Sequence, residues 1–151
     1  MDGDLFALSN GKVVRLIGID APDSRPTARA KMFAERSGKR LEDILAVGKK
    51  AKKFVQKLVE GKEVRLEFDR LDHDEDGNIL AYVYDVGTYK HMIDISSPVT
   101  YVLSGSEIFI NATIVKSGYA SPLMIPPNIK HARMFKSLSN EAQTNKRGLW
   151  E

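Results

Sequence analysis

The residues best suited to chemistry stand at the two ends of a short apolar run. Arg15 begins this run, Asp20 ends it, and Asp23 follows directly after Pro22. The run is rich in branched side chains and is stopped by the proline, which is typical of a buried strand. A strand fixes the separation between a guanidinium and the carboxylates beyond it. This arrangement suits the binding of a phosphate next to a divalent cation.

A hairpin would bring a further carboxylate to this run. Ser9-Asn10-Gly11 separates two apolar stretches, and Asn-Gly between such stretches is a strong turn signal. The two ends of the hairpin carry Asp4 and Asp20. We therefore expect the chain to fold back so that these two carboxylates lie close together.

Motifs along nearly the whole chain resemble the staphylococcal nuclease (thermonuclease) family. Asp2-Gly3-Asp4 is similar to the family's D-G-D-T turn, and Arg15 to Pro22 is similar to its R-L-x-x-[IV]-D-[TA]-P-E segment. Four later segments also match. Val64 to Asp69 resembles a strand of the family and Gly77 to Tyr84 resembles a hairpin. Ile110 to Ala120 resembles a helix, and Glu141 to Trp150 resembles the C-terminal E-A-x(n)-G-[LI]-W motif.

The resemblance implies a mixed α+β, mainly β fold in a single domain over residues 1–151. We expect a five-stranded OB-fold barrel with about three helices. The family has a strand before the D-G-D turn, so the first strand of this barrel is expected to be truncated. Tyr89 to Ile110, an insertion relative to the family, would fill that slot or extend the neighbouring hairpin.

The same resemblance implies a calcium-dependent nuclease that leaves 3′-phosphate ends on DNA or RNA. Asp4, Asp20 and the backbone carbonyl of Ala21 are then the Ca²⁺ ligands, which suits a hard cation. Arg15 would clamp the phosphate, although pairing with a neighbouring carboxylate is the common role of such an arginine. Asp23 stands where the family has a glutamate that orients the attacking water, and it is one methylene shorter.

Three departures from the family pattern favour weak activity. The family's second catalytic arginine aligns with Asn78, and the tyrosine before the preceding glycine aligns with Asp76. A tyrosine-bearing loop aligns with Leu123 to Ile125. Arg70 or the basic insertion Ser24 to Asp43 could supply the missing cation. The alternative is a degenerate domain that binds nucleic acid or protein without cleaving.

Basic residues after the candidate site could steer nucleic acid toward it. Arg25, Arg29 and Lys31 lie in the basic insertion, which is otherwise a solvated loop or short helix. Lys49 lies on the polar face of an amphipathic helix predicted over Ile44 to Glu60. The alternative interpretation of both sets of charges is an ordinary solvated surface, and for the helix lysines it is the favoured one.

An acidic turn between two predicted strands resembles part of a calcium loop. Asp72, Asp74 and Asp76 fit the early positions of an EF-hand, but Val83 stands where the loop needs a glutamate. A weak second calcium site and a plain acidic turn are both open interpretations.

The C-terminal third contains two asparagines with helix-capping signals. We expect Asn111 to cap a short helix that ends at Gly118, and Asn128 to cap the last helix. By resemblance to the family, His131 in that last helix pairs structurally with Glu67 and is not a catalytic base.

Composition limits the remaining possibilities. The chain has 151 residues and no cysteine, which excludes a disulfide scaffold and a thiolate metal site. A net charge of +3 permits an anionic partner without demanding one. No apolar run approaches the roughly 18 residues of a membrane span, and we expect a monomer. Residues 1–4 do not form a signal peptide, so any export signal would lie upstream, as an extracellular or cell-envelope parent protein would require.

Overall fold

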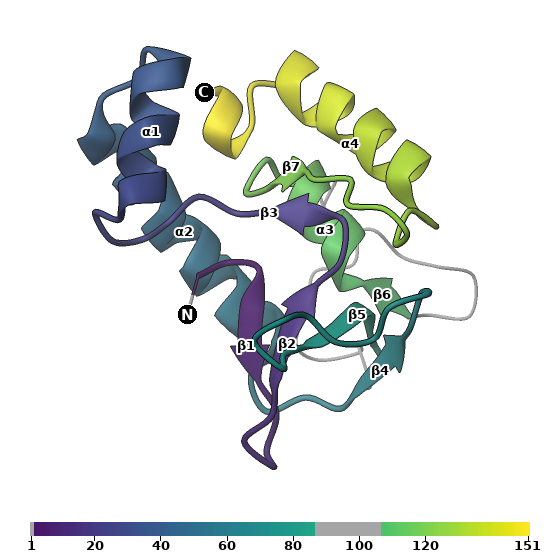
Figure 1. Cartoon of the computed structure of the whole chain (residues 1–151). Coiled ribbons are helices and arrows are strands. Elements are labelled where there is room, and N and C mark those ends of the chain that lie inside the picture. The colour runs from purple at the N-terminus through teal and green to yellow at the C-terminus, as the bar shows by residue number, and fades with distance from the viewer. Residues whose placement is uncertain (1, 87–106) are drawn as a thin grey trace.

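The computed structural model describes residues 2–86 and 107–151. Figure 1 shows a sheet at one end of the molecule and helices α1 and α4 at the other, with α2 running from α1 towards the sheet. The elements in chain order are β1 (Leu5–Ala7), β2 (Val13–Leu16), β3 (Ile19–Asp20), α1 (Ala28–Ser37), α2 (Leu41–Val59), β4 (Val64–Glu67), β5 (Ile79–Asp85), β6 (Ile108–Phe109), α3 (Ile110–Lys116), β7 (Ser121–Pro122), α4 (Ala132–Thr144) and the 3-10 turn η2 (Gly148–Trp150).

Strand β5 is the central strand of the main sheet. Its first half pairs in parallel with β2, and its second half pairs antiparallel with both β4 and β6. The sheet order is β1-β2-β5-β4, with β6 beside β5, and a separate pair is formed by β3 and β7. The mixed α+β class predicted from the sequence is therefore confirmed.

The predicted closed barrel is wrong for the part of the chain that the structure describes. Strands β1 and β4 lie at the two ends of the sheet order, and no pairing joins them among the described residues. A groove of about 1030 Å³ is lined by β1, the C-terminal half of α2 and the residues leading into β4. The sheet therefore stays open at this edge. Most of the insertion Tyr89 to Ile110, proposed to fill the slot of a first strand, lies outside the described residues.

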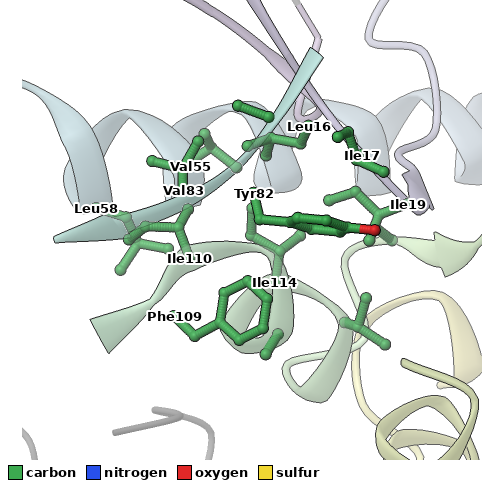
Figure 2. Close-up of a cluster of buried hydrophobic side chains, with 14 of the residues drawn as sticks. Leu16, Ile17, Ile19, Val55, Leu58, Tyr82, Val83, Phe109, Ile110 and Ile114 are labelled. Atoms are coloured by element: carbon green, nitrogen blue, oxygen red, sulfur yellow. The ribbon is translucent and has the colours of Figure 1, made fainter. Parts of the chain in front are cut away.

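The core lies between the sheet and helices α2, α3 and α4. Tyr82 and Val83 of β5, together with Leu16 of β2, are almost completely buried. Figure 2 shows Tyr82 in the middle of this cluster, between Leu16 and Ile114 of α3. The burial of apolar side chains from both halves of the chain fixes the sheet against the helices.

The expected number of about three helices is also wrong, because the basic insertion folds into an additional helix. Thr27 caps the N-terminus of α1 by accepting a hydrogen bond from the backbone N–H of Ala30. Gly38 ends the helix in the left-handed region, with φ of 69°. Four α-helices are present in the described residues.

The amphipathic helix predicted over Ile44 to Glu60 is confirmed as α2, which begins slightly earlier, at Leu41. Its buried residues recur every three or four positions and form one face: Ile44, Gly48, Ala51, Val55 and Leu58. No helix in the described part of the chain is long and apolar enough to cross a membrane.

Both predicted asparagine caps are wrong. Asn111 lies inside α3, completely buried, and its side chain accepts from the backbone N–H of Val83 and donates to the carbonyl of Ile17. Asn128 makes two hydrogen bonds with the backbone of Leu71. Each asparagine satisfies backbone groups of a distant segment, which a local capping signal does not reveal.

Candidate functional site

A tight turn brings Asp4 to the loop that follows β3. The Asp2 carboxylate accepts hydrogen bonds from the backbone N–H and the hydroxyl of Ser24, at 3.0 and 2.8 Å. Gly3 packs so closely that a Cβ placed on it would lie 3.1 Å from the Cβ of Ala21 and from that of Ala51. The turn is therefore fixed between the Ala21–Ser24 loop and helix α2.

The hairpin predicted around Asn10-Gly11 is confirmed and forms the other side of the site. Leu8 and Lys12 are joined by a backbone hydrogen bond of 2.8 Å, and β1 pairs antiparallel with β2. The backbone N–H of Leu16 donates to the carbonyl of Asp4 at 2.9 Å. Arg15 pairs in register with Leu5, one residue from Asp4. The sequence-predicted residues Asp4, Arg15 and Asp20 thus share one region of the molecule.

Asp4 is a buried carboxyl group whose charged form is disfavoured by its surroundings. Its relative exposure is 3%, and a hydrogen bond from its own backbone N–H compensates its charge only in part. Burial, and secondarily the charge of Asp20, raise the pKa of Asp4 to about 6, although Arg15 and Arg29 act in the opposite direction. A buried carboxylate beside a second one calls for a cation nearby.

The oxygen atoms around Asp4 are chemically suited to calcium. Asp4 and Asp20 provide carboxylates, and the carbonyl of Ala21 adds a neutral oxygen, which are ligands that Ca²⁺ prefers. No cluster of three or more acidic or histidine side chains that could hold a metal occurs within residues 2–86 and 107–151. A calcium ion here would depend on the backbone carbonyl and on water for its remaining ligands.

Arg29 of α1 reaches into this acidic region. Its Nη1 lies 2.5 Å from Oδ1 of Asp20, and its Nη2 lies 3.3 Å from the carbonyl oxygen of Ala21. Nε and Nη2 also donate to the two carboxylate oxygens of Asp23. The hydrogen bonds to Asp23 raise the pKa of Arg29 above its ordinary value, so this guanidinium is a permanent positive charge.

Asp23 is fully engaged by the N-terminus of α1. Besides the fork of Arg29, its Oδ2 accepts a hydrogen bond from the Thr27 hydroxyl. Its side chain is only 5% exposed, and although burial acts to raise its pKa, the bonds from Arg29 and Thr27 outweigh burial and lower it. In this arrangement the carboxylate anchors a helix and has no oxygen free of a protein donor.

Gly48 allows α2 to approach the loop that carries these residues. A side chain at Gly48 would overlap the carbonyl of Asp23 and approach that of Pro22 to 2.9 Å. Only a residue without a Cβ fits this crossing. The glycine therefore fixes the position of the Asp20 to Asp23 backbone relative to the core.

Arg15 contacts a carboxylate of the acidic turn. Its Nε lies 3.3 Å from Oδ2 of Asp74, in an ion pair without hydrogen-bond geometry, and its side chain is 40% exposed. Asp74 in turn accepts from the backbone N–H groups of Asp76 and Asn78 and from the Asn78 amide, at 2.9 to 3.0 Å. Asn78 thus holds Asp74, the ion-pair partner of Arg15, in place, and it supplies no positive charge.

Asp72 and Asp74 of the acidic turn, for which a weak second calcium site with Asp76 and a plain turn were both open interpretations, make local contacts in the structure. Asp74 is used to cap the turn, and Asp72 pairs with Nδ1 of His73 at 3.0 Å. These carboxylates are not part of any metal-binding cluster among the described residues. The contacts use both carboxylate oxygens of Asp74 and one of Asp72, which favours a plain acidic turn.

The other basic residues singled out from the sequence are all exposed. They are Arg25, Lys31 and Lys49, predicted to meet nucleic acid, and Arg70, considered as a source of the missing cation. Sequence reasoning missed the role of Thr27, whose position before an Ala-rich segment is a capping signal, and the contact of Arg29 with the acidic site, for which no local signal exists.

The structural pair predicted for Glu67 and His131 is confirmed. Nε2 of His131 lies 2.7 Å from Oε1 of Glu67, which also accepts from the Tyr84 hydroxyl at 3.1 Å. Lys130 donates to the other carboxylate oxygen at 2.9 Å. This network joins β4, β5 and the start of α4, away from the acidic site.

Comparisons with known proteins match nearly the whole chain to one family. The family described as "Staphylococcal nuclease homologue" matches residues 13–151. A thermonuclease from Staphylococcus intermedius is 28% identical over 155 aligned positions, which cover all of this chain and 72% of that protein. A thermonuclease from Staphylococcus hyicus is 26% identical over 154 positions, covering 99% of this chain and 71% of that protein.

Proposed function

Because this chain belongs to the staphylococcal nuclease family, we propose that it is a calcium-dependent phosphodiesterase that hydrolyses DNA, RNA or both to products with 3′-phosphate ends. The names of its relatives support nuclease activity in general. The observation that carries the finer proposal is the buried Asp4 carboxylate beside Asp20, next to an arginine. Such a site favours a divalent cation and the phosphate that the cation would bind.

Asp4, Asp20 and the carbonyl of Ala21 are the residues that would hold the calcium ion. When bound, Ca²⁺ would act as a Lewis acid that polarises a phosphoryl oxygen and partly neutralises its charge. The two carboxylates suit this role because Asp4 is buried and Asp20 raises its pKa, so both favour a nearby positive charge.

Arg15 would meet the phosphate at the edge of the same site. A guanidinium donates two parallel hydrogen bonds to phosphate oxygens and can stabilise the negative charge that builds up during hydrolysis. The partial exposure of its side chain supports this role, while the ion pair with Asp74 would have to loosen first. Arg25, Lys31 and Lys49 are proposed to guide the nucleic acid by long-range attraction.

Asp23 would orient the attacking water, as the family resemblance implies. In the structure both of its oxygens are occupied by Arg29 and Thr27. The proposed role therefore requires at least one of these donors to move away during the reaction. We propose that the protein acts as a monomer.

The test is a cleavage assay with single-stranded DNA and RNA in the presence of Ca²⁺ or of a chelator. We expect cleavage only with Ca²⁺, and products that a polymerase extends only after phosphatase treatment, because a 3′-phosphate blocks extension. Binding to the oligonucleotide without any cleavage would contradict the proposal and support a degenerate binding domain. Equal cleavage with a chelator would contradict the calcium dependence.

A further inference from the structure

The guanidinium of Arg29 lies where the proposed calcium ion would find its ligands. It donates to Oδ1 of Asp20 and to the carbonyl of Ala21, and it is within electrostatic range of Asp4. We propose that Arg29 is a built-in counter-ion that competes with calcium for this acidic site, so that metal binding requires the α1 arginine to leave. This inference rests on the calcium site proposed above and adds a residue that controls its occupancy.

The competition follows from shared atoms. Calcium lies about 2.3 to 2.6 Å from its oxygen ligands. Two of the protein oxygens that would bind it, on Asp20 and Ala21, already accept hydrogen bonds from Arg29 at 2.5 and 3.3 Å. A divalent cation within this distance would also repel the guanidinium, although the partial exposure of Arg29 and Asp20 weakens this repulsion. The calcium ion and the Arg29 guanidinium therefore compete for the same oxygens of Asp20 and Ala21.

The position of Arg29 is built into the fold. Thr27 caps α1 and donates to Asp23, and Asp23 in turn holds Nε and Nη2 of Arg29. The crossing at Gly48 fixes the backbone of Asp23 against α2. The arginine is therefore held towards the acidic site by Asp23, which Thr27 and the Gly48 crossing fix in turn.

The Arg29 side chain can also leave the acidic site by rotating into solvent. Its side chain is 49% exposed, so rotation into solvent needs no rearrangement of the core. Departure of Arg29 would release Asp20 and Ala21 for the metal and would free an oxygen of Asp23. Calcium binding would thus be coupled to the availability of the residue proposed to orient water.

The alternative is an ordinary salt bridge that stays in place while calcium binds beside it. The two cases differ in what happens to calcium affinity when the arginine is removed. Competition predicts tighter binding without Arg29. A supporting salt bridge predicts unchanged or weaker binding, because the carboxylates would lose their positioning partner.

The first test is a calorimetric titration of Ca²⁺ into the unsubstituted protein, Arg29→Gln and Arg36→Gln. Arg36 is exposed on the same helix, so its substitution removes the same charge without touching the site. We expect Arg29→Gln to bind Ca²⁺ about 10-fold or more tightly than the unsubstituted protein, and Arg36→Gln to bind it within about 2-fold.

The outcomes separate the inference from the proposed function. Equal or weaker calcium binding by Arg29→Gln overturns the inference and leaves the calcium site standing. Failure of all three proteins to bind Ca²⁺ overturns the calcium site itself and the inference with it. Equal gains in Arg29→Gln and Arg36→Gln would show a general charge effect and also overturn the inference.

A second measurement uses the unsubstituted protein, in case Arg29→Gln does not fold. The Nε–H signals of arginine side chains are followed by NMR during a Ca²⁺ titration, with Arg29 assigned from Arg29→Lys. We expect the Arg29 signal to lose its protection from solvent exchange, while that of Arg147, paired with Glu141 elsewhere, stays unchanged. An unchanged Arg29 signal, with shifting amide signals at Asp4 and Asp20, would contradict displacement.

Discussion

At the scale of single residues, the chemistry of the site depends on how each charge is compensated. Asp4 is buried next to Asp20, and the cations that oppose this repulsion are Arg15 and Arg29. Each arginine has a second carboxylate partner, Asp74 for Arg15 and Asp23 for Arg29. Each arginine therefore both forms an ion pair that stabilises the fold and lies where it could contact a ligand of the acidic site.

Asp4→Asn should stabilise the protein when calcium is removed by a chelator. The folded-state pKa of Asp4 is about 6, above the ordinary 3.8, so its charged form opposes folding at neutral pH. We expect a gain of about 1 to 3 kcal/mol in the free energy of unfolding at pH 8, measured by urea denaturation. The variant should also lose any stabilisation by added Ca²⁺. A destabilised variant would show that Asp4 has a favourable partner in the apo state.

Asp74→Asn should strengthen the interaction with nucleic acid. The amide keeps an oxygen to cap the turn but removes the negative charge 3.3 Å from Nε of Arg15. We expect KM for a single-stranded oligonucleotide to fall by about 3- to 10-fold because Arg15 is released towards phosphate. Asp76→Asn, an exposed residue of the same turn, is the matched control. Equal effects from both variants would mean that only the net charge of the turn matters.

At the scale of elements, the site is assembled by contacts between the Asp20–Ser24 loop, α1 and α2. The loop is held from one side by the Asp2–Ser24 hydrogen bonds and from the other by the crossing at Gly48. Helix α1 adds the third contact through Thr27 and Asp23. Displacement of any one of these elements would move Asp20 relative to Asp4.

Gly48→Ala tests this crossing. A glycine-to-alanine change within a helix normally stabilises it by up to about 1 kcal/mol. Here the added methyl group would overlap the Asp23 carbonyl, so we expect a loss of about 1 to 3 kcal/mol or more in thermal or urea unfolding. Lys57→Ala, at an exposed position of α2, should have little effect. Stabilisation of Gly48→Ala would show that the loop moves freely away from the helix.

Glu67→Gln tests the network that joins β4 and β5 to α4 and predicts a pH-dependent loss. Although burial acts to raise its pKa, hydrogen bonds from His131, Lys130 and Tyr84 lower the pKa of Glu67 below its ordinary 4.5. Its carboxylate therefore stabilises the fold above about pH 4.5, and this contribution disappears as the pH falls through the lowered folded-state pKa.

We expect Glu67→Gln to lose about 1.5 to 3 kcal/mol in the free energy of unfolding at pH 7. The difference from the unsubstituted protein should shrink steadily in urea titrations below pH 4.5, where the unfolded carboxyl becomes protonated. A loss that is independent of pH would indicate a packing effect in place of the charge.

At the scale of the whole molecule, local signals in the sequence predicted individual turns and helices but not the contacts between distant segments. The Asn10-Gly11 turn and the amphipathic α2 follow from neighbouring residues, and both are confirmed. Resemblance to the nuclease family correctly paired His131 with Glu67. Family membership, through residues 13–151, is confirmed as well.

The errors share one physical cause, which is contact between residues distant in the sequence. Asn111 and Asn128 have the composition of helix caps, yet each is used to satisfy backbone groups of another segment. The short helix that was one expectation for the basic insertion is present as α1, but the contact of its Arg29 with the acidic site was not predicted. Local periodicity contains no information about such partners, so these features become visible only in the folded molecule.

The most direct test of this account compares calcium-dependent cleavage of single-stranded DNA by the unsubstituted protein, Asp20→Asn and Asp43→Asn. Asp43 is an exposed aspartate of α2, so its substitution makes the same chemical change outside the site. We expect Asp43→Asn to cleave at the unsubstituted rate, and Asp20→Asn to remain folded but lose calcium-dependent cleavage because a charged ligand of the cation is gone. Unchanged cleavage by Asp20→Asn would contradict the assignment of the acidic site as the catalytic metal site.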